Sequence, residues 1–344
     1  MTYQVTARKY RPQTFADLIG QDHIRRTLQN ALKRDRVAHA YIFSGPRGVG
    51  KTTVARLLAK AVNCERRSAA AAGGEALPDE PCNECSSCRE IVEDRHPDVL
   101  EIDGASNTGV DNVRDLREQV RYAPARGRCK VYVIDEVHML SKGAFNALLK
   151  TLEEPPPGVL FVFATTEPER IPATIASRCQ CFDFHRLSPA VIAAHLTRIA
   201  EGEGRAVDRA AIQLLARTAE GSMRDAQSLF DQVVAFAAGR EDDGPLGEAE
   251  VSEVLGLVAG SVLWKVARMI ARDDAPGLLE VARGIFQEGQ DVKQFCLSLM
   301  GFLRDLRVAE GVEDPAGLLD LMPEEMEELR ALAKETREAA DAWT

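Results

Sequence analysis

Residues 45–52 read GPRGVGKT, and this stretch decides the fold. It lies between the apolar run 40–43, AYIF, and a helix-like stretch that begins at Thr53. A strand, a glycine-rich turn and a helix start in this order are typical of a phosphate-binding loop, because glycines let backbone N–H groups converge on phosphate oxygens. The flanking elements favour this interpretation over a loop that merely turns the chain.

Each residue of the loop has an expected role. We expect Lys51 to reach the terminal phosphates of ATP and the Thr52 hydroxyl to hold Mg²⁺. The other nucleotide-binding candidates belong to the same loop and to the first turn of the helix: Gly45, Arg47, Gly48, Val49, Gly50 and Thr53.

A second pattern is the pair Asp135-Glu136, which ends the apolar run 130–134. In a parallel sheet the carboxyl ends of the strands face the ligand. We expect Asp135 to hold Mg²⁺ through water and Glu136 to orient and polarise the attacking water. Taken alone, the pair is more typical of the acidic start of a helix. Its combination with the phosphate-binding loop indicates a nucleotide hydrolase.

Composition limits the possible classes of protein. The chain has 344 residues, of which 45% are hydrophobic and 28% charged, so a buried core and two or three domains are expected. No apolar run approaches the ~20 residues of a membrane span, and the N-terminal region lacks the apolar segment of a signal peptide. We therefore expect a soluble, cytoplasmic protein. Its net charge of -10 argues against nucleic-acid binding over the whole surface and leaves only local contacts.

Strands and helices alternate over the first half of the chain. Apolar runs predict strands at 40–44, 98–103, 130–135, 159–165 and 180–184, and periodicity predicts helices at 23–34 and 110–120. This alternation predicts an α/β fold for residues 1–185, with a mostly parallel sheet covered by helices on both faces. Helical patterns alone follow, which predicts a small helical domain at 186–243 and a second helical domain at 244–344.

Two segments have unusual compositions. Residues 68–77 are rich in alanine and glycine and look like low complexity. Residues 323–340 carry acidic residues first and basic residues later, which suits a helix dipole and predicts a solvated helix.

The cysteines predict a metal site. Cys64 is followed, after a spacer, by Cys82-x2-Cys85-x2-Cys88, which makes four thiolates available for one tetrahedral structural zinc within an insertion at 64–88. A disulfide framework is the alternative, but cytosolic thiols stay reduced, which favours zinc. The other four cysteines lie in or beside apolar runs, and we expect them to be buried and inert: Cys129, Cys179, Cys181 and Cys296.

Further catalytic candidates follow along the chain. Thr165 and Thr166 close a strand with hydroxyls that can sense the γ-phosphate or the water beside it. Arg178 lies within Ser177-Arg178-Cys179, and Arg224 lies at an expected helix start. Each arginine alone is more typical of a surface ion pair. In this order, together with the phosphate-binding loop, the set resembles a AAA+ ATPase.

Six motifs make the resemblance more specific. They are RKYRPQTFADLIGQ (8–21), DEVHML (135–140), NALLKTLEEPP (146–156), ATTEP (164–168), SRC (177–179) and GSMRDA (221–226). With these motifs, over nearly its whole length, the chain resembles the family of tau/gamma ATPase subunits of the bacterial DNA polymerase III clamp loader.

The resemblance implies an ATP-hydrolysing motor subunit that loads a sliding clamp onto primed DNA, with ATP, Mg²⁺ and Zn²⁺ as cofactors. It implies that Thr165 or Thr166 is sensor 1, and that Arg178 acts on the ATP of a neighbouring subunit, which requires an oligomer. The last helical domain would be the collar of a pentamer with related subunits in the replisome. It further implies that Arg11 and Pro12 flank the adenine side and that Arg224 is sensor 2. The other residues implied at the nucleotide are Ala7, Tyr10 and Met223.

DNA contacts are expected at the start of one helix. Residues 105–113 are mostly small and polar, and the N–H groups at such a helix start can meet a phosphate. An N-cap followed by a solvated helix face explains the pattern equally well. The candidate DNA contacts are Asn107, Thr108, Arg114 and Lys142.

Two other functions are compatible with a AAA+ chain. One is a nonhydrolysing structural subunit of the same assembly, against which the intact Lys51, Asp135 and Arg178 argue. The other is a different AAA+ remodeller, such as a branch-migration helicase or a chaperone, against which the four-cysteine pattern and the SRC motif argue.

Overall fold

The computed structural model describes residues 4–106, 108–237, 244–256, 260–287, 292–312, 315, 319 and 323–341. The chain divides into two compact units, and each is described by itself. The first unit comprises Met1–Val191 and Gly221–Asp225, and the second comprises Ile192–Glu220 and Ala226–Thr344.

The first unit is built on a parallel sheet of five strands in the order β2-β3-β4-β1-β5. The strands are β1 (Ala40–Ser44), β2 (Val99–Asp103), β3 (Lys130–Asp135), β4 (Val159–Thr165) and β5 (Gln180–Asp183). Every residue of β4 is buried. Helices cover a parallel sheet on both faces, so side chains on both sides of a central strand are buried. This burial explains why the sequence of β4 is an unbroken apolar run.

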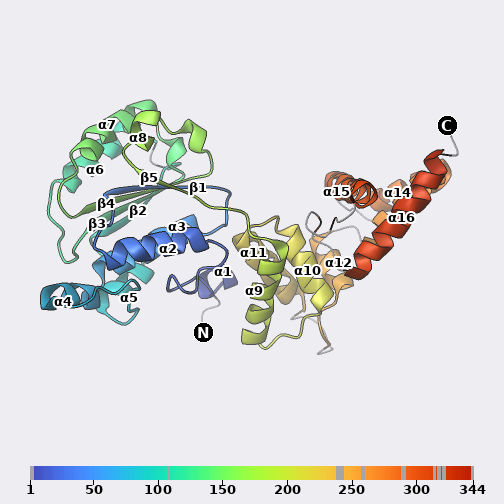
Figure 1. Ribbon diagram of the computed structural model, residues 1–344, viewed down its shortest axis with the longest axis horizontal. Helices are drawn as coiled ribbons and strands as arrows, with labels where there is room; N and C mark the ends of the chain where they lie inside the picture. The colour runs from blue at the N-terminus through green and yellow to red at the C-terminus, as the bar shows by residue number, and fades with distance from the viewer. Residues whose placement is uncertain are drawn as a thin grey trace. The chain divides into compact units, whose positions relative to one another are not determined.

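Helices cover the two faces of this sheet, as predicted (Figure 1). On one face lie α2 (Asp22–Lys33) and α3 (Lys51–Asn63), and on the other lie α6 (Val110–Val120), α7 (Lys142–Glu153) and α8 (Ala173–Ala176). The shorter elements of this unit are α1 (Thr6–Lys9), α4 (Glu65–Gly73), α5 (Ser86–Val92), η1 (Val137–Met139) and η2 (Pro168–Arg170).

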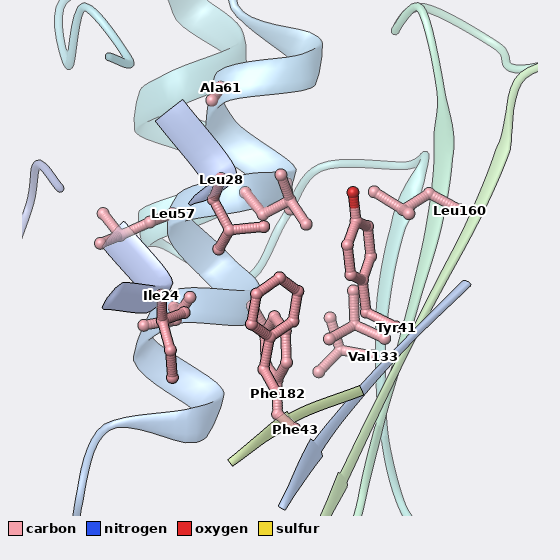
Figure 2. Packing of buried hydrophobic residues seen from close by; sticks show 14 of the residues in the cluster. Ile24, Leu28, Tyr41, Phe43, Leu57, Ala61, Val133, Leu160 and Phe182 are labelled. Atoms are coloured by element: carbon pink, nitrogen blue, oxygen red, sulfur yellow. The ribbon is translucent and has the colours of Figure 1, made fainter. Parts of the chain in front are cut away.

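The core between the sheet and its first helical layer is dense. Figure 2 shows side chains of α2 and α3 meeting those of the strands, and it labels Ile24, Leu28, Tyr41, Phe43, Leu57, Ala61, Val133, Leu160 and Phe182. Phe43 and Leu28 are at most 1% exposed. Burying one large apolar side chain contributes about 1.5–3 kcal/mol, so this cluster holds α3 firmly against β1.

The strand order decides where polar residues gather. Because β4 lies between β1 and β3, the carboxyl ends of these three strands are neighbours. Ser44 at the end of β1 is in register with Thr165, and Ile134 is in register with Phe163. The loop after β1, the hydroxyls after β4 and the acidic pair after β3 therefore come to one edge of the sheet.

The alanine-rich segment 68–77 begins inside a helix, because its residues 68–73 belong to α4. Alanine is the best helix former, and α4 ends at Gly74, which has left-handed angles. Arg67 of this helix is 1% exposed, and its guanidinium donates hydrogen bonds to Leu32 O and to Asp35 at 2.7 and 2.8 Å. These contacts fasten α4 to the end of α2.

The described regular structure that follows β5 is helical. It comprises α9 (Pro189–Gly202), α10 (Arg209–Thr218), α11 (Met223–Ala237), α12 (Glu248–Leu255), α13 (Gly260–Ala271), α14 (Ala275–Gln287), α15 (Val292–Gly311) and α16 (Pro323–Asp341). The helix predicted at 323–340 exists, but it is not solvated on all sides, because Met326, Leu329 and Leu332 are buried against α13 and α15. None of the described helices has the length and apolar character that a membrane span requires.

Candidate functional site

The loop between β1 and α3 depends on its glycines. Gly45 and Gly48 have φ values of +134° and +78°, which side-chain-bearing residues rarely adopt. A Cβ at Gly45 would lie 2.3 Å from Phe184 O, and one at Gly48 would lie 1.9 Å from Ser222 Oγ. Space and backbone angles therefore both require glycine, and the loop wraps the start of α3 with its N–H groups.

Lys51 is the first residue of α3 and is 6% exposed. Its Nζ donates hydrogen bonds to Gly45 O and Pro46 O, both at 2.7 Å. Burial lowers the pKa of Lys51, while the nearby Glu136 and Asp135 act to raise it. The ammonium group is thus held against the loop, close to two carboxylates.

Thr52 and Asp135 meet directly, although they are far apart in the chain. The Thr52 Oγ1 donates a hydrogen bond to Asp135 Oδ2 at 2.8 Å, and Asp135 Oδ1 accepts one from the N–H of Glu136 at 3.0 Å. A hydroxyl and a carboxylate are the hard oxygen donors that Mg²⁺ prefers, with water completing its shell. These two residues therefore fit the Mg²⁺ expected from the sequence.

Glu136 has an unusual backbone. Its φ and ψ are 46° and 45°, in the left-handed region that costs a non-glycine residue about 1 kcal/mol or more. This conformation turns the chain sharply after β3, and Thr166 Oγ1 donates a hydrogen bond to Glu136 Oε2 at 3.2 Å. Of the two sensor-1 candidates, Thr166 is therefore the one whose side chain donates to Glu136, the carboxylate expected to act on water.

His138 belongs to the same site and was missed from the sequence. Its side chain is 6% exposed, and its Nδ1 lies 3.0 Å from Thr165 Oγ1 and 3.5 Å from Glu136 Oε2. Its Nε2 lies 3.1 Å from Glu167 Oε1. The signal that reasoning from the sequence overlooked was a histidine in the turn directly after the acidic pair.

Arg224 and its neighbours border the phosphate-binding loop. The Arg224 N–H donates to Gly48 O at 3.4 Å, and Ser222 Oγ accepts from the Asp225 N–H at 3.2 Å, which caps the start of α11. Burial lowers the pKa of Arg11, with Arg56 the next cause and Arg224 a smaller one. The positive charges of Arg11 and Arg224 therefore lie within reach of one another.

The other nucleotide candidates have different exposures. Val49 is 3% exposed and packs into the core, so only its backbone is available to a phosphate, whereas the Arg47 side chain is exposed. Thr53 is half-buried in the first turn of α3. Ala7 lies in α1, Tyr10 and Pro12 follow it, and Met223 begins α11.

Cys64, Cys82, Cys85 and Cys88 lie together, with all four Sγ atoms within 4.8 Å of one another. Tetrahedral zinc with ~2.3 Å bonds to sulfur has S···S edges of roughly 3.8 Å. The Cys82 and Cys88 Sγ atoms are 3.9 Å apart, and all eight cysteines are free thiols. The arrangement fits zinc, which would crosslink the end of α3 to the start of α5, and does not fit a disulfide framework.

Local backbone groups favour a thiolate in this cluster. Burial acts to raise the pKa of Cys82, but the backbone N–H groups of Cys85 and Glu84 more than offset this and bring it to about 7. Burial raises the pKa of Cys85 and of Cys88. A thiolate is the form that binds a metal, and the lowered pKa of Cys82 favours that form.

The remaining cysteines correct one expectation. Cys129 and Cys179 are half-buried, and burial raises the pKa of both, that of Cys179 to about 12. Cys181 and Cys296 are exposed, so their predicted burial is wrong. Cys181 lies in β5, which is an edge strand with exposed residues, and apolar neighbours in sequence did not reveal this.

Arg178 lies far from the phosphate-binding loop of its own chain. It precedes β5, at the amino end of the strands, whereas the loop follows β1 at the carboxyl end, and a strand of five residues spans about 16 Å. Its guanidinium donates to Thr174 O at 2.6 Å and pairs with Glu153 at 2.7 Å. The pair borders an open cavity of about 870 Å³ that His39 and Gln180 also line.

The DNA candidates come from two neighbouring helix starts. Thr108 O accepts a hydrogen bond from the N–H of Ser141, which is the N-cap of α7, and Lys142 is the first residue of that helix. Arg114 lies in α6, which packs against α7. Asn107 lies outside the described residues.

Three family models match the chain in order. They are the DNA polymerase III delta subunit at residues 20–188, the DNA polymerase III clamp loader subunit ATPase lid domain at 191–239, and domain III of the DNA polymerase III subunits gamma and tau at 246–340. DNA polymerase III subunit gamma of Buchnera aphidicola is 38% identical over 310 residues, which cover 90% of this chain and 82% of that protein. The chain belongs to the tau/gamma family of DNA polymerase III subunits.

Longer family members match as well. DNA polymerase III subunit tau of Bacillus subtilis is 44% identical over 317 residues, and that of Escherichia coli is 45% identical over 318 residues. The matches cover 91% and 92% of this chain but 54% and 47% of those proteins, so the chain spans about half the length of these tau relatives.

A solved structure shows the same fold. The Holliday junction branch migration motor RuvB of Thermotoga maritima aligns with a TM-score of 0.53 at 18% identity, over 76% of this chain and 79% of that chain. This likeness supports the α/β AAA+ architecture of the tau/gamma chain.

Proposed function

We propose that this chain is the ATP-hydrolysing motor subunit of a bacterial DNA polymerase III clamp loader, which opens a sliding clamp and loads it onto primed DNA. The observation that carries the proposal is the contact between Thr52 and Asp135, beside Lys51 and Glu136, in a tau/gamma family member. The proposed domains are a AAA+ domain at 1–185 with its zinc insertion at 64–88, a lid at 186–243 and a collar at 244–344. The family matches at 20–188, 191–239 and 246–340 support this division.

The residues at the sheet edge have distinct roles in hydrolysis. The Lys51 ammonium and the N–H groups of the glycine-rich loop bind the phosphates of ATP. Glu136 orients the attacking water and accepts its proton, and Thr166 holds the carboxylate in place through their hydrogen bond. Thr52 and Asp135 would hold Mg²⁺, which would supply positive charge to offset that of the phosphates.

Two arginines complete the nucleotide site. Arg224 acts on the nucleotide of its own chain, because its backbone contacts Gly48 of the phosphate-binding loop. Arg178 acts on the ATP of a neighbouring subunit, because it lies at the amino ends of the strands and its own phosphate-binding loop lies at their carboxyl ends, a strand length of about 16 Å apart. Such a residue supplied in trans stabilises the negative charge of the transferring phosphoryl group.

The proposed partners are other clamp-loader subunits, the sliding clamp and primer-template DNA. Exposed apolar side chains on α14 and α15 support a collar that joins a pentamer. Leu279 and Phe286 of α14 are 72% and 77% exposed, and Met300 of α15 is 64% exposed. Asn107, Thr108, Arg114 and Lys142 are the proposed DNA contacts, and the place of action is the cytoplasm, at the nucleoid-associated replisome.

The alternatives explain fewer observations. Glu136 holds its carboxylate beside the phosphate-binding loop in a strained backbone conformation. A subunit that does not hydrolyse ATP has no need of such an arrangement. The solved branch-migration motor shares only the fold, because a likeness at 18% identity says nothing about function. The family matches over 20–188, 191–239 and 246–340 favour clamp loading instead.

A pair of variants tests the catalytic assignment. Lys51→Ala is expected to abolish tight binding of Mg·ATP, because it removes the charge over the terminal phosphates. Glu136→Gln is expected to keep binding and to stop turnover, because the carboxylate acts on water. Nucleotide titration and steady-state ATPase assays, followed by clamp loading on primed DNA with the partner subunits, check these outcomes. Equal losses of ATP affinity in both variants would contradict the roles assigned here.

A further inference from the structure

The cysteine insertion contacts the N-terminal segment through Glu80. This residue lies two positions before Cys82, and its Oε2 accepts a hydrogen bond from the Phe15 N–H at 2.7 Å, while its Oε1 accepts from the Ala16 N–H at 3.0 Å. The same Oε1 accepts from Gln29 Nε2 of α2 at 2.9 Å. A single carboxylate therefore binds two consecutive backbone N–H groups and a side chain of α2.

Lys60 makes a second contact between the same regions. It lies one turn before Cys64 on α3 and is 2% exposed. Its Nζ donates hydrogen bonds to Gln13 O at 3.0 Å and to Gln13 Oε1 at 2.9 Å. The buried ammonium thus fastens the N-terminal segment to the last turns of α3, directly before Cys64.

The segment that these two residues hold also reaches the phosphate-binding loop. Residues 11–20 contain no helix or strand, so their shape depends on side-chain contacts. Leu18 comes within 3.8 Å of the position that a Cβ on Gly50 would take, and Phe15 is fully buried in the core with α3. The segment therefore passes from the cysteine insertion to the base of the nucleotide site.

We propose that the four-cysteine module, acting through Glu80 and Lys60, positions residues 11–18 for nucleotide binding. Occupancy of the four thiolates by zinc and binding of the nucleotide are then coupled. This inference rests on the proposed ATP site and adds a positioning role for two residues outside it. Coupling between two sites typically changes affinity by 5- to 150-fold, so loss of the Glu80 contacts is expected to weaken nucleotide binding by about 10-fold.

The experiment compares Glu80→Ala with Glu75→Gln, which changes an exposed carboxylate of the same insertion. Zinc content, the Kd for the fluorescent nucleotide mant-ATP and hydrogen exchange of residues 11–18 are measured in both variants. Glu80→Ala is expected to retain one zinc per chain, to bind mant-ATP about 10-fold more weakly and to exchange faster over 11–18. Glu75→Gln is expected to match the unmodified chain in all three measurements.

A second arm removes zinc from the unmodified chain with a chelator. Faster exchange over 11–18 is expected, and removal of zinc from Glu80→Ala is expected to add less than the sum of the two separate effects. A folded, zinc-bearing Glu80→Ala chain with unchanged mant-ATP affinity and unchanged exchange overturns the proposal. Failure of the unmodified chain to bind mant-ATP would instead overturn the proposed ATP site, so the two failures are distinguishable.

Discussion

Glu136 combines a strained backbone with two side-chain neighbours that hold its carboxylate. Its left-handed angles place it at the turn after β3, where Thr166 donates to it at 3.2 Å and His138 lies 3.5 Å away. His138 in turn reaches Glu167 at 3.1 Å. Because the imidazole is buried and lies between two carboxylates, we infer that it sets the direction in which Glu136 points.

A substitution at His138 tests this positioning role. We expect His138→Ala to lower kcat by about 10- to 100-fold while KM and nucleotide affinity change little, because only the orientation of the catalytic carboxylate is lost. His138→Gln, which keeps a polar group near Glu136, is expected to recover part of kcat. Met139→Ala changes an exposed neighbour and serves as the control. Steady-state kinetics and nucleotide titration measure these effects. An unchanged kcat in His138→Ala would show that His138 does not position Glu136.

Asp98 is a second residue whose contacts determine a local shape. It is fully buried, and its carboxylate accepts hydrogen bonds from the N–H groups of Ala125, Arg126 and Gly127, each at 2.7 Å. Burial acts to raise the pKa of Asp98, but these donors more than offset it, so the pKa lies below its ordinary value. The loop between α6 and β3 therefore depends on one ionised side chain.

Asp98→Ala is expected to lower the free energy of unfolding by about 3 kcal/mol at pH 7, because it leaves buried N–H groups without an acceptor. A depressed pKa stabilises the fold above the unfolded value of about 3.9, and this contribution is lost as the pH falls through the folded pKa. The difference between the two chains is therefore expected to shrink below about pH 4. Urea unfolding at pH 7 and at lower pH measures the difference in the free energy of unfolding between the unmodified chain and Asp98→Ala. A difference that increases as the pH falls would contradict this account.

The insertion formed by α4, α5 and the four cysteines is the element for which local spacing was most informative. The pattern Cys82-x2-Cys85-x2-Cys88 predicted a cluster, and the fold brings the Sγ atoms of these cysteines within 4.8 Å of one another and of Cys64. We expect one zinc per chain, lost on substitution of any of the four, whereas Cys129→Ser keeps it. Elemental analysis measures this, and chelators are expected to lower the Tm, since a structural site contributes folding free energy. Protein purified without chelator and free of zinc would exclude the site.

Sequence patterns predicted those elements whose cause is local. The strands 40–44, 130–135 and 159–165 agree to the residue, because central strands buried on both faces are continuous apolar runs. The edge strands β2 and β5 were predicted one residue too long, because the extra residues, Asp98 and Phe184, are buried beside the strand ends without belonging to the strands. The same local logic located the phosphate-binding loop and the acidic pair.

Contacts between distant segments were not predictable in this way. Glu80 binds the N–H of Phe15 across 65 positions, and His138 meets Thr165 across 27. Neither pair shows a periodicity or a spacing, because both arise only when the strand order brings separate loops together. Composition likewise did not show how α4 packs, because the buried Arg67, whose guanidinium donates to Leu32 O of α2, precedes the alanine-rich stretch.

The position of Arg178 concerns the assembled protein. The residue lies at the amino ends of the strands, opposite to its own phosphate-binding loop, so its proposed target is the ATP of another chain. Its partner Glu153 holds the guanidinium at 2.7 Å beside the open cavity at this edge. Binding and hydrolysis are therefore expected to separate in an Arg178 variant. In the proposed assembly, the charge is needed most while the γ-phosphoryl group of the neighbouring subunit's ATP is in transit.

Arg178→Ala is expected to leave the ATP affinity of the isolated chain nearly intact and to lower DNA- and clamp-stimulated hydrolysis of the complex by about 10² or more, since arginine fingers contribute ~10³ to 10⁵ elsewhere. Mixing locates the defect. Arg178→Ala chains retain a working phosphate-binding loop, and Lys51→Ala chains retain a working finger, so interfaces that pair the two intact parts are expected to recover activity. If confirmed mixed assemblies never exceed either variant alone, or if isolated Arg178→Ala chains fail to bind ATP, the arginine does not act across a subunit boundary.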